Sequence, residues 1–188
     1  MGLITLIDEN RSKIIDEWFK ATIKTYPKEK SEFFKKNKDS FANPVGNTIS
    51  KSLEDILKGL TDDVENEKIR KILDPAIRIR AVQEFAPSSA VSFIFFLKGV
   101  IRESLKKKLN SEIEKELLIF ESKIDMVCLI AFDIYMGCRE QVFTYKANHV
   151  KERTLKLLEK ADLLCEVPEV GAEIIPHNVY LNGDFNDK

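Results

Sequence analysis

The sequence predicts an all-helical domain, and three stretches carry this prediction. Residues 112–150 repeat apolar side chains every three or four positions, which is the spacing of one face of an α-helix. Residues 90–97 are apolar nearly all round, which is typical of a buried helix. A third apolar series follows Asn43-Pro44, and asparagine before proline is a typical helix start.

The composition restricts the class of protein. A chain of 188 residues fits one domain, and 44% apolar with 32% charged residues is ordinary for a globular protein. The net charge of −1 argues against a nucleic-acid partner, because such proteins are usually basic. The apolar runs are shorter than the roughly 20 residues of a membrane span, and the N-terminus lacks a secretion signal. We therefore expect a cytoplasmic protein without a membrane span.

The first predicted helix begins at a capping box of Thr5 and Asp8 and ends near Tyr26-Pro27. Residues 28–42 are rich in lysine and glutamate, with phenylalanines between them. This pattern predicts a solvated loop or a short helix held by its phenylalanines. The alternative is a basic groove for an acidic partner.

The middle of the chain predicts two further helical segments. The helix that begins at Pro44 is expected to end near residues 61–63. Its apolar stripe consists of Val45, Ile49, Leu53, Ile56 and Leu60. Residues 66–85 keep the helical period, but Asp74-Pro75 interrupts them. Either one helix kinks there, or two short helices meet end to end.

Two buried helices are predicted next. One opens at Pro87, and a cap of Ser111 and Glu114 begins the other. The connection between them is very short, so they are expected to pack antiparallel. The later helix also carries a second apolar series, which consists of Leu118, Leu129, Phe132, Met136 and Phe143. A helix that is apolar on two sides is expected to be covered on two sides, and we predict that this is the central helix.

The pattern changes near the C-terminus. Residues 165–188 lack a helical period and contain prolines and glycines. We predict a helical domain over residues 1–164 and an extended tail over residues 165–188, which lies on the domain or on a partner.

No arrangement of residues indicates catalysis. The three cysteines form no CxxC pair, and Cys128 and Cys138 are predicted to be buried free thiols inside the last helix. The sequence lacks the HExxH, phosphate-loop and GxSxG motifs. We expect no enzymatic activity, no cofactor and no metal site. The alternative is a haem site that uses His149, four residues after Tyr145.

Three residues are candidates for ligand sensing. Phe93 and Phe96 are three positions apart on a buried helix, where they line a shared pocket or simply pack in the core. Asp125 and Asp133 interrupt the most apolar part of the chain, and a buried carboxylate needs a partner or a proton. We expect one or both of them to reach a groove or to pair with Arg78, Arg80 or Arg102. The sharper hypothesis gives Asp133 a role in sensing a ligand.

Two short motifs bring in a family resemblance. Residues 14–19 read IleIleAspGluTrpPhe, and residues 41–46 read PheAlaAsnProValGly. With these motifs, residues 3–155 resemble the N-terminal domain of the RsbT co-antagonist proteins of the RsbR/RsbRD type. The resemblance implies a globin-like fold without haem and a sensory input domain that is usually dimeric. Such domains precede a STAS domain in the stressosome, which controls the RsbT kinase and general stress signalling. No catalytic residue is implied.

One departure from the family changes the expected role. Only a short tail follows residue 160 in the sequence, so we expect no STAS domain after the helical domain. Stand-alone copies of such domains occur in anaerobic sulfur-metabolising bacteria near respiratory electron-transfer genes, which implies a partner in a signalling or respiratory regulatory pathway. The leading hypothesis is a non-haem sensor that binds a small ligand or a protein and signals through a homodimer interface or the tail. The alternatives are a haem-binding gas or redox sensor that uses His149, and a ligand-free helical adaptor.

Overall fold

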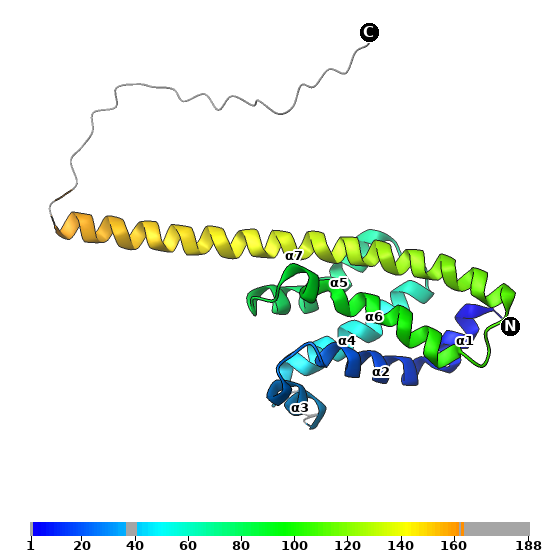
Figure 1. The fold of residues 1–188 in the computed structure, drawn as a ribbon. Helices are drawn as coiled ribbons and strands as arrows, with labels where there is room; N and C mark the ends of the chain where they lie inside the picture. Colours follow the sequence, from blue (N-terminus) through cyan, green and yellow to red (C-terminus); the bar gives the residue numbers. More distant parts are fainter. Residues whose placement is uncertain (1, 37–40, 162, 164–188) are drawn as a thin grey trace, which may run out of the picture. The chain divides into compact units, whose positions relative to one another are not determined.

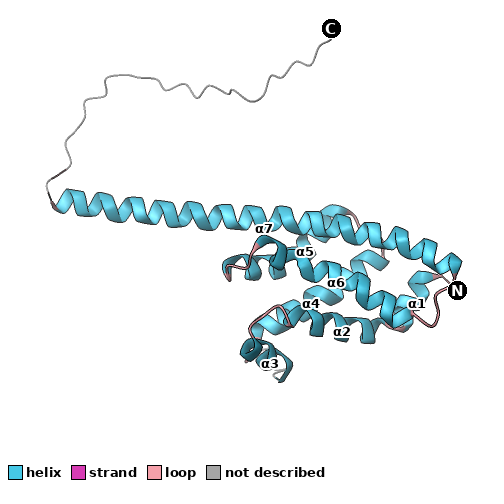
Figure 2. Cartoon of the chain, in the orientation of Figure 1, coloured by secondary structure: helices cyan, strands magenta, loops and turns pink. Residues whose placement is uncertain are grey.

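The computed structural model describes residues 2–36, 41–161 and 163. Figure 1 and Figure 2 show that helices and loops make up this part of the chain. The helices are α1 (Leu3–Glu9), α2 (Arg11–Ile23), α3 (Lys28–Lys36), α4 (Pro44–Thr61), α5 (Asn66–Val82), α6 (Pro87–Leu105) and α7 (Ser111–Lys160). The prediction of an all-helical fold is confirmed. The chain forms two units, Met1–Ala147 and Asn148–Lys188, so α7 begins in the first unit and ends in the second.

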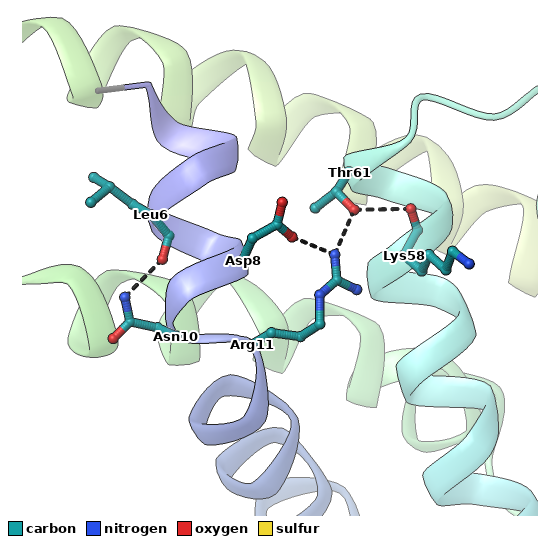
Figure 3. A network of polar contacts seen from close by, with 6 residues as sticks. All are labelled: Leu6, Asp8, Asn10, Arg11, Lys58 and Thr61. Carbon is teal, nitrogen blue, oxygen red and sulfur yellow. Dashed lines mark hydrogen bonds and ion pairs between the residues drawn. The ribbon is translucent and has the colours of Figure 1, made fainter.

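The first predicted helix is in fact two helices, separated at Asn10. The Asn10 side-chain amide donates to the Leu6 carbonyl at 2.7 Å, which satisfies the end of α1 (Figure 3). Arg11 donates from Nη2 to the Asp8 carboxylate and to the Thr61 hydroxyl, the latter at 3.0 Å. The guanidinium therefore ties the junction of α1 and α2 to the end of α4.

The predicted capping box of Thr5 and Asp8 is wrong. The residue before α1 is Gly2, and no side chain of its own segment caps the helix. Instead, the Leu3 amide donates to Oε2 of Glu116 in α7 at 2.6 Å. A carboxylate at a helix N-terminus satisfies an otherwise unpaired amide and suits the helix dipole. A residue distant in sequence has taken the role of the local cap.

The segment after Pro27 forms the short helix α3. Phe34 is buried, while Phe33 and Phe41 are exposed. The α4 start at Asn43-Pro44 is confirmed, because Oδ1 of the buried Asn43 accepts from the Gly46 amide at 2.9 Å.

The interruption at Pro75 does not divide α5, which runs as one helix through the proline. Its end is fixed by residues 83–86. Glu84 has a φ of 61°, and the Phe85 amide donates to the Arg80 carbonyl at 3.3 Å. A left-handed residue followed by this backward hydrogen bond is the Schellman motif that closes many helices. The motif places Phe85 beside the last turn of α5.

Two ion pairs confirm that α6 and α7 are antiparallel. Lys98 lies 2.6 Å from Asp125, and Arg102 lies 2.6 Å from Glu121. A step of four residues forward in α6 thus matches a step of four backward in α7. The cap of α7 differs from the prediction, because Oδ1 of Asn110, not Ser111, accepts from the Ile113 amide at 2.9 Å.

One face of α7 contributes to the core, as the first apolar series predicts. The buried residues of this helix run from Ile113 to Cys138, and they pack with a core to which α1, α2, α4, α5 and α6 contribute. The second apolar series is not covered. Leu118, Leu129, Phe132, Met136 and Phe143 are all exposed. The expectation that this chain covers both apolar sides of α7 is therefore wrong.

Two further predictions are the extended C-terminal tail and the absence of a membrane span. The tail predicted at residues 165–188 lies outside the described residues. In the part of the chain that the structure describes, no helix combines the length and the apolar character needed to cross a bilayer.

Candidate functional site

The most distinctive surface is the exposed apolar face of α7, here called the α7 stripe. Its members are 42% to 65% exposed, although all are large apolar side chains. They are Leu118, Ile119, Met126, Leu129, Phe132, Met136 and Phe143. A contiguous row of such side chains is unusual on the surface of a monomer and marks an interaction site.

The stripe has a regular spacing. Leu129, Met136 and Phe143 recur every seven residues within the first unit. The same interval continues along the sequence at Val150 and Leu157, which are also exposed residues of α7. Apolar residues repeated every seven positions form a seam along one side of a helix, and helices with such seams pack against each other.

Charged residues beside the stripe hold α7 to the rest of the first unit. Lys123 donates to Asp63 at 2.6 Å, and Lys146 donates to Glu84 at 2.8 Å. The hydrogen bond from Lys146 lowers the pKa of the Glu84 carboxyl. Asp63 and Glu84 follow the ends of α4 and α5. Polar side chains along α7 are thus paired within the chain, while the apolar stripe is left open.

Asp133 lies within this stripe, but its side chain is two-thirds exposed. Its carboxylate is 3.6 Å from Nη2 of Arg70 in α5, and that of Asp125 pairs with Lys98. The partners predicted for these two carboxylates are therefore wrong. Arg78 pairs with Asp74, Arg102 pairs with Glu121, and Arg80 has no acidic partner among the described residues.

The structure places Phe93 and Phe96 in different environments of α6. Phe93 is 1% exposed, its ring centroid lies 5.2 Å from the guanidinium of Arg80, and its carbonyl accepts from Nε1 of Trp18 at 2.6 Å. Phe96 is partly buried against the core. Phe93 thus faces a buried cation, whereas Asp133 lies on the exposed face of α7.

A surface groove of about 590 Å³ lies between α2 and α6. Its floor includes Ala21, Gly99 and Val100, and Gly99 has no atom within 4 Å of the place where a Cβ would stand. Four lysines and two glutamates line it: Lys13, Lys20, Lys24, Lys35, Glu17 and Glu103. Lys20 pairs with Glu17 at 2.7 Å and lowers the pKa of that carboxyl. The remaining charge is positive, which suits an acidic ligand or partner.

The two cysteines that were predicted to be free thiols are buried, and the histidine that was considered as a haem ligand is exposed. Cys128 and Cys138 are buried free thiols, as predicted, and burial raises the pKa of Cys128 to about 11. His149 is an exposed residue of α7. In the described part of the chain, no three His, Cys, Asp or Glu side chains gather to hold a metal.

Sequence reasoning missed two features that a sharper signal would have indicated. The interval of seven residues from Leu129 to Leu157 favours a helix–helix seam over burial within the chain. In α5, Arg80 continues the apolar series of Ile69, Leu73 and Ala76, so its position already indicated a buried arginine. Neither signal can be recognised from the amino-acid composition, because both depend on the spacing of residues along the chain.

Comparison with known families gives one match. The model described as "RsbT co-antagonist protein rsbRD N-terminal domain" matches residues 12–149, which is more than half of the chain. No curated protein and no solved structure matches the chain.

Proposed function

The chain belongs to the family of RsbT co-antagonist protein rsbRD N-terminal domains, and from this membership we propose that it is a non-catalytic signalling input domain that works as a homodimer. The family is one of stressosome-related signalling input domains and is not known for catalysis. The resemblance stated from residues 14–19 and 41–46 is thereby confirmed at the level of the family. The dimer, the ligand and the direction of signalling are parts of the proposal.

The observation that carries the proposal is the α7 stripe. Its apolar side chains have no cover within the described residues, and leaving them in water costs about 25 cal/mol for each Å² of apolar area. A partner that buries several of them gains free energy from each. The stripe is therefore proposed as the interface.

A second copy of this chain fits the stripe better than an unrelated protein. Helix seams with a seven-residue interval bury their side chains against seams of the same interval, because the knobs of one helix then meet the holes of the other. Twofold symmetry brings two identical stripes together. Lys123 and Lys146 pair with Asp63 and Glu84 within the chain, so neither lysine brings an unpaired charge to the second copy.

The proposed input is an acidic ligand or partner segment that binds in the lysine-lined groove and acts through α6. The lysine-lined groove lies on α2 and α6, and α6 is joined to α7 by the pairs Lys98–Asp125 and Arg102–Glu121. An acidic ligand or an acidic segment of a partner protein in this groove would contact α6. A shift of α6 would then change how α7 presents its stripe. This is the proposed path from input to dimer.

Two alternatives predict different observations. A haem sensor would need His149 as an iron ligand, and its exposed position gives this alternative no support from burial. It predicts a Soret band in the purified protein. A ligand-free adaptor predicts that filling the groove leaves the dimer unchanged.

Sedimentation equilibrium of the full chain tests the dimer. The wild type is expected to sediment as a dimer, and Met136→Glu as a monomer, because two glutamates would face each other in the interface. Val82→Glu is the matched control, since Val82 is 67% exposed in α5 and is not part of the stripe. A wild-type monomer, or a Met136→Glu variant as dimeric as the control, would contradict the proposal.

A further inference from the structure

The interior of the first unit holds one arginine without a charge partner. Arg80 is 1% exposed and lies in the last turns of α5. Its Nη2 donates to the Thr25 hydroxyl at 2.9 Å and to the Ser89 carbonyl at 2.7 Å. Its Nε and Nη1 are buried and have no hydrogen-bond acceptor among the described residues.

Among the residues that the structure describes, no acidic side chain compensates the charge of Arg80. Burial lowers the pKa of its guanidinium, and the only side chain that opposes this shift is the phenol of Tyr26. A guanidinium nevertheless keeps its proton at any ordinary pH. Buried charges in proteins are normally paired, because moving an unpaired ion out of water is costly. A positive charge is thus enclosed without a negative one.

Aromatic rings surround this cation. The guanidinium carbon lies 4.3 Å from the ring centroid of Phe85 and 5.2 Å from those of Tyr26 and Phe93. The faces of the rings offset part of the cost of burial by cation–π attraction. They accept no hydrogen bond of ordinary strength from Nε or Nη1. The rings explain why the site is apolar, but they do not satisfy the hydrogen-bond donors on Nε and Nη1.

A third polar group shares this requirement. Tyr26 is 5% exposed, and its buried hydroxyl lies beside the Arg80 guanidinium, which can donate to the hydroxyl oxygen but cannot accept the hydroxyl proton. Burial raises the pKa of this hydroxyl, which therefore stays protonated and able to donate. The N–H groups of Arg80 and the O–H group of Tyr26 are thus present in one enclosed region, where the O–H group has no acceptor among the described residues. What they lack is an acceptor that also carries a negative charge.

We propose that Arg80 and Tyr26 bind a small monovalent anion in the interior of the first unit. One negative charge balances the one guanidinium. The ligand is small because the rings of Tyr26, Phe85 and Phe93 all lie close to the guanidinium. Its surroundings are mostly apolar, so weakly hydrated anions such as bromide, chloride or nitrate lose less on entering than strongly hydrated fluoride.

The segment that covers the site is linked to α7. Phe85 is held by the hydrogen bond from its amide to the Arg80 carbonyl, and its own carbonyl accepts from the Tyr135 hydroxyl. Arg139 also donates to the Ala81 carbonyl at 3.1 Å. Tyr135 directly precedes Met136, a member of the α7 stripe, and Arg139 follows Met136 by three residues. The anion site and the stripe are therefore connected through one loop.

Halide exchange tests the site. The melting temperature of the full chain is measured while bromide replaces fluoride at constant total halide and ionic strength. We expect a saturable rise for the wild type, because a ligand that binds only the folded state stabilises it. Tyr26→Phe removes one donor and keeps the ring, so the bromide dissociation constant is expected to rise about fivefold. Tyr145→Phe, which alters an exposed tyrosine, should bind bromide like the wild type.

A crystal grown in sodium bromide gives an independent measurement. An anomalous bromine peak within hydrogen-bond reach of Nη1 of Arg80 is expected. Water in place of bromide at this position would overturn the proposal. So would the absence of a saturable response to bromide, or a Tyr26→Phe variant that binds bromide as tightly as Tyr145→Phe.

Discussion

The guanidinium of Arg102 donates two hydrogen bonds to the carboxylate of Glu121, from Nε at 2.6 Å and from Nη2 at 2.7 Å. This paired geometry joins α6 to α7, and the hydrogen bonds to Glu121 raise the pKa of Arg102. The Glu121 side chain is only 11% exposed, so it depends on this partner. The pair sets the register in which the stripe-bearing helix lies on the domain.

Arg102→Met should lower the free energy of unfolding by about 1–3 kcal/mol, because it leaves the carboxylate of Glu121 without its donor. Chemical denaturation measures this change. Lys106→Met is the matched control. Its ammonium lies 3.8 Å from Glu103 and both side chains are more than 70% exposed, so we expect a change below about 0.5 kcal/mol. Equal effects of the two substitutions would contradict the role given to the pair.

Asn43→Ala should destabilise the protein by about 1–2 kcal/mol, because the buried Asn43 side chain caps α4. The same side chain donates from Nδ2 to the Phe34 carbonyl at 3.3 Å, which joins the end of α3 to the start of α4. Thr48→Ala removes a hydroxyl that bonds only within α4, and it should change stability little. Thermal unfolding of both variants provides the comparison.

Cys128 should react slowly with iodoacetamide in the native state at pH 8. Burial raises the pKa of its thiol from 9.0 to about 11, and the thiolate is the reactive form. Because the folded thiol holds its proton more tightly than the unfolded thiol, stability falls as the pH rises from 9 toward 11. Cys128→Ala should reduce this loss above pH 9. Labelling of the native and the denatured chain at equal rates would contradict the burial of this thiol.

Asp133→Asn should leave folding stability within about 0.5 kcal/mol of the wild type, because its exposed carboxylate is 3.6 Å from Arg70. The same substitution should tighten the dimer by up to about tenfold, since it removes a charge that the interface would have to desolvate. Sedimentation and thermal unfolding separate the two effects. Weaker association of Asp133→Asn would contradict the place of Asp133 in the interface.

The helices were predictable wherever local chemistry determines them. Asn43-Pro44 marks a helix start through a capping side chain and a proline, and Pro87 marks one through the proline alone. The N-terminus of α1 was not predictable in this way, because its amide bonds to Glu116, more than a hundred residues later in the sequence. The cap of α7 is Asn110, one residue before the predicted Ser111.

The candidate site was only partly predictable, for a related reason. Leu129 and Met136 are apolar in the sequence, but only the structure decides whether this chain covers them. Asp133 pairs with Arg70 because of the relative positions of α5 and α7, which no local pattern contains. Arg80 occupies a core position of α5, and its lack of an acidic partner is visible only after the helices pack.

Oxidation of Met126 and Met136 by hydrogen peroxide shows whether a second copy covers the α7 stripe, because both side chains belong to the stripe and are 48% and 47% exposed within one chain. Peptide mass spectrometry follows each methionine in the wild type and in Leu129→Glu, which is expected to be monomeric. Both methionines should oxidise several-fold more slowly in the wild type, because a second copy would cover them. Equal oxidation rates in the two proteins would contradict a dimer formed through α7.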